Sequence, residues 1–306
     1  MLVMPLALAL DAALGEPPAA VHPVVWIGRA ASMLERRAPA GPLPRLLYGV
    51  GMMVAVTGGS ALAGGAATRI AARLPWPLGL LVEAWVLKTT LSVRALIEAG
   101  ALVERHLEAD DLEGARQAVT ALVSRDVSAL GPPLLASAAV ESLAENTADS
   151  IVGPLLYYAL GGLPAALAYR AANTLDAMIG YHGPYEQLGK AAARFDDLLN
   201  LVPARLSSAL LLAGGALAGG DTANGLEITR RDHGLTASPN AGWPMSTMAG
   251  LLGTRLEKPG HYRLGGELPP TDLPAIDHAA EIVKVATVLT VPVALAVRWL
   301  RGVVRP

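Results

Sequence analysis

Long apolar stretches separated by polar segments dominate the pattern of this chain. Four of them approach the roughly 20 residues that an α-helix needs to cross a bilayer, and a shorter one at the N-terminus predicts a membrane-embedded or interfacial helix. Their positions are 1–15, 46–72, 77–103, 203–220 and 282–300. No stretch of useful length shows the period of two that is typical of strands. The pattern predicts an all-α, polytopic integral membrane protein, built as one membrane-embedded domain over residues 1–306.

Residues 151–169 are also apolar, but Gly153-Pro154 and Gly161-Gly162-Leu163-Pro164 interrupt them. This stretch could span the membrane, re-enter it, or pack as a core helix. If every apolar stretch crossed, residues 104–149 and 170–200 would face opposite sides, and no single surface site could use both. We therefore expect 151–169 to be re-entrant or buried. An amphipathic helix near 104–123 and a polar loop segment over 221–281 complete the organisation.

The amino-acid composition also indicates a membrane protein, and it argues against nucleic-acid binding and thiol chemistry. The chain is 53% hydrophobic and 16% charged with a mean hydropathy of +0.42, whereas soluble domains carry about a quarter charged residues. A net charge of −2 shows no basic excess for nucleic acid. The absence of cysteine excludes disulfides and thiolate chemistry. Arginines at 29, 36, 37 and 45 predict a cytoplasmic first loop.

Three clusters of carboxylates, amides and arginines recur at helical spacing within residues 141–205. Burying such groups among apolar residues is costly unless they are paired or bind a ligand. In the first cluster, Glu141, Glu145 and Asp149 are spaced i, i+4, i+8, which predicts one acidic stripe with Asn146 beside it. Such a stripe could hold Mg²⁺ through its oxygen atoms. The alternative is a solvated helix face, and the burial cost favours the metal site.

The second cluster places Arg170, Asn173 and Asp176 on one helix face by their spacing of three. The arginine could grip a phosphate or carboxylate with its bidentate fork, or it could form an internal ion pair with the aspartate. Both alternatives stay open from the sequence. The third cluster shares the same residue types and consists of Arg194, Asp196, Asp197, Asn200 and Arg205.

Two segments in the polar part of the chain have the composition of binding loops. Ser238-Pro239-Asn240-Ala241-Gly242 combines rigid turns with a glycine that permits close backbone approach, although connectors often share this composition. Lys258 and Arg263 form a basic patch suited to an anion. His22 is interpreted as a turn residue, and no histidine spacing indicates zinc. Nucleotide-binding Walker A and G-x-G-x-x-G motifs are absent from the sequence, as is the G-x-S-x-G elbow.

The chain resembles the adenosylcobinamide-phosphate synthase (CobD/CbiB) family of cobalamin biosynthesis. Seven sequence words carry the resemblance in family order over most of residues 10–265. They are L-D-A-A-L-G-E-P-P with H-P-V-V-W-I-G-R, S-R-D, E-S-L-A-E-N-T-A-D-S, Y-R-A-A-N-T-L-D-A-M-I-G-Y, F-D-D-L-L-N-L-V-P-A-R, S-P-N-A-G-W-P-M and L-E-K-P-G-H-Y-R-L-G. Thr236-Ala237 stands where the family often has His-Pro, which bears on loop detail.

The resemblance implies a multi-pass enzyme of the cell (inner) membrane with its active site facing the cytoplasm. It implies amide ligation of aminopropanol phosphate to a propionate of the corrinoid adenosylcobyric acid, with ATP as cosubstrate and Mg²⁺. The implied catalytic set is Glu145, Asp149, Arg170, Asp176 and Asp197, with the metal held by Glu141, Glu145 and Asp149. The implied substrate-binding set is Asn146, Asn173, Arg194, Asn200, Arg205, Ser238, Asn240, Lys258 and Arg263. The bilayer is the expected surrounding partner, and assembly into a homo-oligomer stays open.

Two other classes use the same residue types. An ion-coupled membrane transporter or sensor also places Glu, Asp and Arg within the membrane. A membrane transferase acting on a Mg²⁺-bound diphosphate would also need acidic clusters. Liposome flux without product formation would indicate transport, and corrinoid-dependent release of phosphate would indicate ligation.

Overall fold

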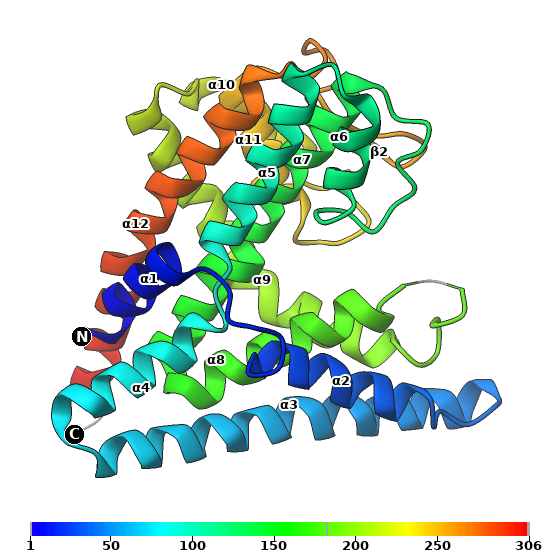
Figure 1. Ribbon diagram of the computed structural model, residues 1–306. Coiled ribbons are helices and arrows are strands. Elements are labelled where there is room, and N and C mark those ends of the chain that lie inside the picture. The colour runs from blue at the N-terminus through cyan, green and yellow to red at the C-terminus, as the bar shows by residue number, and fades with distance from the viewer. Residues whose placement is uncertain (1, 182, 305–306) are drawn as a thin grey trace. The chain divides into compact units, whose positions relative to one another are not determined.

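The computed structural model describes residues 2–181 and 183–304, and helices make up most of this part of the chain (Figure 1). A single two-stranded antiparallel hairpin pairs Leu256 with Leu264 within the described residues. The helices are α1 (Val3–Leu14), α2 (Pro23–Glu35), α3 (Pro42–Arg73), α4 (Trp76–Lys88), α5 (Val93–Glu108), α6 (Leu112–Val119), α7 (Pro132–Thr147), the π-helix η1 (Ala148–Val152), α8 (Gly153–Ile179), α9 (Lys190–Ala218), α10 (Thr222–Asp232), α11 (Gly242–Leu252) and α12 (Pro274–Val304), and the strands are β1 (Leu256–Lys258) and β2 (Tyr262–Leu264).

Four helical segments are long and apolar enough to cross a membrane. They are Pro42–Arg73, Pro132–Ile179, Lys190–Ala218 and Pro274–Arg301. Two of them contain the predicted stretches 46–72 and 282–300, and Lys190–Ala218 covers all but the last two residues of 203–220. The prediction of an all-α polytopic membrane protein is confirmed. The N-terminal stretch forms the shorter apolar helix α1, and residue 1 lies outside the described residues.

The chain divides into two compact units, so the single predicted domain has an internal division. The first unit comprises Met1–Ser92, Gly153–Asn200 and Val291–Pro306, and the second comprises Val93–Val152 and Leu201–Thr290. Helices α9 and α12 each contribute residues to both units.

Close packing of α3 against α8 organises the first unit, where the two helices run side by side (Figure 1). Gly64 permits this close approach, because a Cβ at this position would lie only 2.7 Å from the Leu163 carbonyl carbon and oxygen. Gly49 likewise lies against the backbone of Leu188. Gly58 and Gly59 of the same helix have no neighbour within 4 Å of an added Cβ. Glycine-mediated packing of α3 therefore depends on the buried positions and not on the whole glycine-rich run.

Residues 77–103, predicted as one segment, form two helices instead. Helix α4 ends at Lys88 and α5 begins at Val93. The Thr89 and Thr90 hydroxyls donate hydrogen bonds to the carbonyls of Val86 and Leu87, at 2.7 and 2.6 Å. Side-chain hydroxyls that bond to the preceding turn compete with helix continuation. Summed hydropathy across 77–103 cannot register such a local break.

Residues 151–169 lie within the helical segment Pro132–Ile179, and 61% of its most apolar window is buried. At Gly162 the backbone takes φ 67° and ψ −159°, so α8 is two helices joined at a kink. Only glycine adopts such angles without strain, and Pro164 then starts the second helix. The predicted interruption at residues 161–164 is confirmed, while re-entry into a membrane stays a prediction.

In the second unit, α7 packs against α5, α6, α11 and strand β1. Eleven of its sixteen residues are buried, so this helix forms the centre of the unit. Gly100 of α5 adjoins the side chain of Leu143, which lets the two helices approach closely. A helix that is enclosed on all sides leaves its polar side chains in contact with protein groups rather than with bulk water.

The Gly64 contact predicts a specific stability difference between two glycines of α3. We expect Gly64→Ala to lower the free energy of unfolding by about 1–3 kcal/mol, because the methyl group overpacks the α3–α8 contact. Gly58→Ala is the matched control, and it should be neutral or stabilising by about 0.5–1 kcal/mol through helix propensity. Thermal unfolding of both variants in detergent measures the difference. Equal midpoints would contradict the packing role of Gly64.

Candidate functional site

A buried carboxylate, Glu141 on α7, is the centre of a polar cluster in the second unit. Only 3% of this residue is exposed. Arg125 donates two hydrogen bonds to its carboxylate, at 3.0 Å from Nη1 to Oε2 and 3.4 Å from Nη2 to Oε1. Ser137 Oγ donates to Oε1 at 2.7 Å and the Tyr262 hydroxyl donates to Oε2 at 2.6 Å. Four donor atoms therefore surround one carboxylate.

The cluster also fixes the β-hairpin on α7. Ser137 Oγ accepts a hydrogen bond from the backbone N–H of Glu257 on β1 at 2.8 Å, and Tyr262 belongs to β2. Burial, followed by the negative charge and the hydrogen bond of Glu141, raises the pKa of Tyr262 far above its ordinary value. The phenol therefore stays protonated and remains a donor at any physiological pH.

These contacts bear on the proposed magnesium ligands. Both Glu141 oxygens already accept hydrogen bonds from protein donors, and a metal ligand would have to exchange them. Regular α-helical spacing ends at Thr147, and Asp149 lies in the π-helix η1 that follows. Within the described residues no group of three His, Cys, Asp or Glu side chains is placed to hold a metal. The structure gives Glu141 a pairing role, and the magnesium site stays a proposal.

One amide side chain, that of Asn146, lies on the same helix as the first cluster. The Asn146 amide donates to the Ser142 carbonyl at 3.0 Å and to the Ser142 hydroxyl at 3.1 Å, and its oxygen accepts from Ser150 at 3.3 Å. These contacts orient Asn146 along α7 and into η1. Glu145 and Asp149 also make polar interactions.

In the first unit, two residues of the second cluster are in contact. Arg170 Nη1 donates to Asn173 Oδ1 at 3.1 Å, and Asp176 lies against Gly180. Both Arg170 and Asp176 have further polar interactions. The arginine is therefore oriented by a neighbouring amide, and a face shared with Asp176 stays a prediction.

The third cluster is divided. Asn200 is 2% exposed, donates to Asp196 Oδ2 at 3.0 Å, and accepts from the Tyr169 hydroxyl at 2.7 Å. Asn200 therefore joins α8 to α9 within the first unit. Arg194 lies on the exposed face of α9, and Asp197 makes polar interactions of its own. Asp196 and Asn200 thus have the enclosed, hydrogen-bonded setting of a site, and Arg194 does not share it.

Arg205 belongs to the second unit, where it meets the Ser238–Trp243 loop. Its guanidinium carbon lies 4.7 Å from the centroid of the Trp243 ring, and Nη1 donates to Asn240 Oδ1 at 3.2 Å. The centroids of the His233 and Trp243 rings lie 4.1 Å apart. Ser238 Oγ accepts from the Asn240 backbone N–H at 3.2 Å and so shapes the turn. Arg205 and Asn240 are brought together here as a positively charged, amide-flanked surface.

Glu257 partly neutralises the basic patch that contains Lys258 and Arg263. Glu257 pairs with Arg263 at 2.8 Å and with Arg255 at 3.1 Å. The hydrogen bond from Arg263 is the largest of the effects that hold the pKa of Glu257 below its usual range. Lys258 follows on the same strand β1. An anionic ligand at Arg263 would have to compete with Glu257.

The predicted residues are therefore distributed over both units. Each unit assembles its own subset: the second unit holds Glu141, Glu145, Asn146, Asp149, Arg205, Ser238, Asn240, Lys258 and Arg263, and the first holds Arg170, Asn173, Asp176, Arg194, Asp196, Asp197 and Asn200. A single pocket formed by both subsets stays a prediction.

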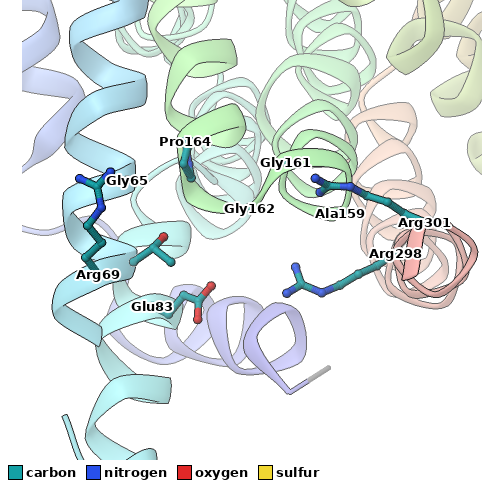
Figure 2. A pocket seen from close by; sticks show the side chains of 10 residues that line it. Gly65, Arg69, Glu83, Ala159, Gly161, Gly162, Pro164, Arg298 and Arg301 are labelled. Carbon is teal, nitrogen blue, oxygen red and sulfur yellow. The ribbon is translucent and has the colours of Figure 1, made fainter. Parts of the chain in front are cut away.

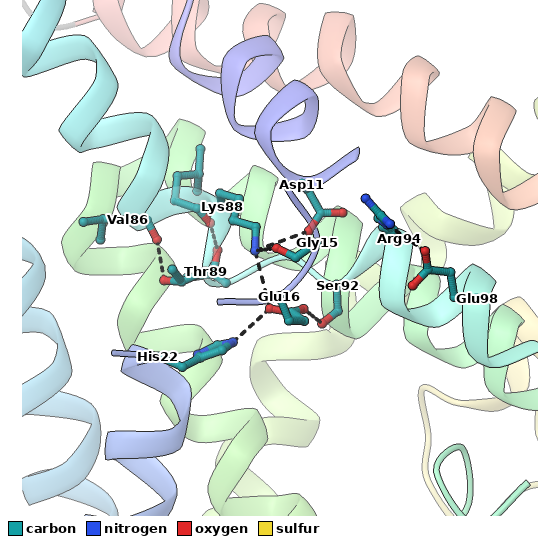
Figure 3. A network of polar contacts seen from close by, with 12 residues as sticks. Asp11, Gly15, Glu16, His22, Val86, Lys88, Thr89, Ser92, Arg94 and Glu98 are labelled. Atoms are coloured by element: carbon teal, nitrogen blue, oxygen red, sulfur yellow. Dashed lines mark hydrogen bonds and ion pairs between the residues drawn. The ribbon is translucent and has the colours of Figure 1, made fainter. Parts of the chain in front are cut away.

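A second buried charge network, around Lys88, was not identified from the sequence (Figure 3). The Lys88 side chain is fully buried, donates to the Gly15 carbonyl, and lies 3.6 Å from Glu16 Oε2 and 4.0 Å from Asp11 Oδ1. His22 contacts Glu16 Oε2 at 2.9 Å, and Ser92 donates to Glu16 Oε1 at 2.6 Å. Burial raises the pKa of Glu16, but the hydrogen bonds and nearby cations outweigh it and lower the pKa overall.

The clue to this network lies in two charged residues that interrupt apolar stretches of the sequence. Asp11 breaks the first apolar stretch and Lys88 breaks the 77–103 stretch, and opposite charges in two apolar helices indicate a pair. His22 caps α2 by accepting from the Val24 backbone N–H at 3.2 Å, which confirms its interpretation as a turn residue. Its contact with Glu16 adds a role that the turn alone did not indicate.

The Glu141 cluster predicts a large stability effect on removal of its cation. We expect Arg125→Gln to lower the free energy of unfolding by about 3–5 kcal/mol, because it leaves a buried carboxylate without its ion-pair partner. Arg94→Gln, which removes an exposed i,i+4 pair with Glu98 at 2.7 Å, should cost about 0.5 kcal/mol or less. Thermal unfolding in detergent compares them. A small effect at Arg125 would mean that Glu141 is neutral or solvated.

Comparison with known proteins places the chain in a family. The family model described as CobD/Cbib protein matches residues 4–290. The cobalamin biosynthesis protein CobD of Dehalococcoides mccartyi is 42% identical over 88% of each chain, and that of Klebsiella pneumoniae is 39% identical over 96% of each. The probable cobalamin biosynthesis protein CobD of Methanothrix thermoacetophila is 39% identical over 94% of this chain and 93% of its own. No solved structure matches. The chain belongs to the CobD/Cbib family.

Proposed function

We propose that this protein is a cobalamin-biosynthesis enzyme that joins an aminoalcohol phosphate, expected to be aminopropanol phosphate, to a propionate of adenosylcobyric acid. The single observation that carries the proposal is the family match over residues 4–290. Relatives matched over most of their length are named cobalamin biosynthesis proteins. The polar clusters on membrane-type helices support an enzyme site in the same chain.

The reaction forms an amide bond and releases the elements of water. A carboxylate and an ammonium group do not condense unaided in water, so we propose that ATP activates the carboxylate. The propionate oxygen would attack the terminal phosphoryl group to give an acyl phosphate and ADP. The free amine would then attack the acyl carbon, and inorganic phosphate would leave. The amine must lose a proton before or during this attack.

The chain's own residues could serve the two charge requirements of this reaction. Arginine can neutralise phosphoryl oxygens or a developing oxyanion, and we propose Arg170 and Arg205 for this role. Asn173 and Asn240, which contact these arginines, would fix their orientation. Asp176 or Asp197 would accept the proton of the ammonium group.

The remaining predicted contacts belong to substrate recognition. Amides such as Asn146 and Asn200 can pair with the amide side chains of a corrin ring, because each presents a donor and an acceptor. Lys258 and Arg263 would attract the phosphate of the aminoalcohol. Ser238 would act indirectly by shaping the loop that carries Asn240.

Magnesium enters the proposal as the expected counter-ion of the nucleotide. The pairing of Glu141 with Arg125 and Tyr262 disfavours it as a ligand, which leaves Glu145 and Asp149 as the proposed carboxylates. Oxygen ligands of this kind suit Mg²⁺. Glu141 would instead hold the hairpin and α7 in place beside them.

Matched carboxylate variants test this assignment. Glu145→Gln and Asp149→Asn keep the side-chain shape but remove one charge, so we expect the rate to fall by roughly two to three orders of magnitude and the Mg²⁺ requirement to rise. Glu108→Gln, on the exposed end of α5, is the control and should be nearly silent. The measurement is mass spectrometry of adenosylcobyric acid incubated with membranes, ATP, Mg²⁺ and aminopropanol phosphate.

The outcomes of this experiment distinguish a wrong assignment of the metal-binding carboxylates from a wrong assignment of the reaction. Product formation that is unchanged in both variants would show that the acidic pair is structural. Absence of corrinoid amide in the wild-type reaction, together with flux of a solute in liposomes, would instead favour the transporter alternative.

A shared cytoplasmic surface for the two units is tested by labelling. The chain lacks cysteine, so single cysteines report on position without background. We expect Ala129→Cys and Lys190→Cys, both at exposed positions, to react with an impermeant maleimide from the cytoplasmic side of oriented membrane vesicles. Leu188 is fully buried and supplies an unreactive control. Labelling of the two sites from opposite faces would contradict one shared surface.

A further inference from the structure

A pocket of about 570 Å³ lies in the first unit, where α8 breaks (Figure 2). Helices α3, α4, α8 and α12 contribute its walls. Gly161, Gly162 and Pro164, at the kink of α8, form one side. The pocket therefore lies where the two halves of α8 meet.

Arginine side chains dominate the charge of this pocket. Arg69, Arg298 and Arg301 line it together with one carboxylate, Glu83, so three positive charges and one negative charge give a formal net of +2. Within the described residues, Arg69 and Arg301 form no ion pair with a carboxylate. Glu83 accepts a hydrogen bond from the Tyr158 hydroxyl at 2.7 Å, which already occupies one of its oxygens.

The direction of two of these side chains brings their charges to the pocket. Figure 2 shows Arg298 and Arg301 extending from α12 toward the kink of α8. The Arg298 side chain is exposed, and its guanidinium carbon lies 5.0 Å from the centroid of the Tyr158 ring, which orients the charge. The N-terminus of the second half of α8 lies at the pocket wall, where the positive end of its helix dipole favours an anion.

A second pocket of about 470 Å³ adjoins the first and shares Thr68, Glu83 and Arg298 with it. Its walls also include the apolar side chains of Leu74, Trp76 and Leu80, and Trp76 is 70% exposed. The arginines of the first pocket and these apolar side chains supply the two kinds of contact that a phosphate headgroup with an attached acyl chain requires.

We propose that this pocket binds a phosphate group, with an anionic phospholipid headgroup as its source. Arg69, Arg298 and Arg301 would bind the phosphate through charge-assisted hydrogen bonds, and the acyl chain would lie against Leu74, Trp76 and Leu80 of the second pocket. None of the residues assigned to amide ligation lines either pocket. The proposal therefore does not depend on that function.

Lipid binding to the delipidated full-length protein in detergent tests the proposal. The probes are phosphatidylglycerol, phosphatidylcholine and inorganic phosphate, and native mass spectrometry measures bound lipid. We expect phosphatidylglycerol to bind at least about tenfold more tightly than phosphatidylcholine. Arg298→Gln/Arg301→Gln should weaken that binding about tenfold or more, because hydrogen bonds to a charged group are lost. Arg69→Gln should weaken it as well.

Arg73→Gln is the matched control, since Arg73 ends the same helix as Arg69 but does not line either pocket. Lipid-free unfolding midpoints, with the single variant Arg301→Gln as a milder change, show that the variants fold. Competition by millimolar phosphate that depends on the same arginines would support the phosphate site and assign it to a soluble ligand. Equal binding of the two lipids, or unchanged binding in the double variant, would overturn the proposal.

Discussion

Pairing of buried charges is the constraint on which this structure depends. A charge enclosed among apolar helices costs several kcal/mol unless hydrogen bonds and an opposite charge offset it. The first unit meets this requirement by surrounding Lys88 with the Gly15 carbonyl and the carboxylates of Asp11 and Glu16. The second unit meets it by giving Glu141 the fork of Arg125 and two hydroxyl donors. Each network joins segments that are distant in sequence, so the charges also specify which helices meet.

Breaks in helices place polar groups where regular helices would not. The kink at Gly162 lies at the arginine-lined pocket, and the hydroxyls of Thr89 and Thr90 end α4 directly after Lys88. The π-helix η1 carries Asp149 directly after the end of α7. In lipid, a break is tolerated where freed backbone groups find other partners or line a polar cavity. Helix interruption and polar chemistry therefore coincide in this fold.

The polar clusters differ in which side-chain groups remain available to bind a ligand. Both oxygens of Glu141 accept protein hydrogen bonds, so this carboxylate contributes to the architecture of α7 and the hairpin. Arg205 instead presents its guanidinium over Trp243 with Asn240 at its edge, and Arg170 is oriented by Asn173. Arginines fixed by aromatic and amide neighbours are oriented in advance for an anion, which lowers the entropic cost of binding. Structural carboxylates and oriented arginines thus have different functions within one chain.

Local sequence determined much of the fold and part of the site. Apolar length identified α3, α9 and α12, the Gly161–Pro164 word identified the kink, and three-residue spacing put Arg170 beside Asn173. These features depend on neighbours within a few turns, which is the range that periodicity covers. The break at residues 89–92 also has a local cause, in the hydroxyls of Thr89 and Thr90, although summed hydropathy does not register it. The partners of Glu141, which are Arg125 and Tyr262, were decided by tertiary structure. A side chain 121 residues away in sequence supplies no local pattern, because its role arises only when folding brings it to the charge it must compensate.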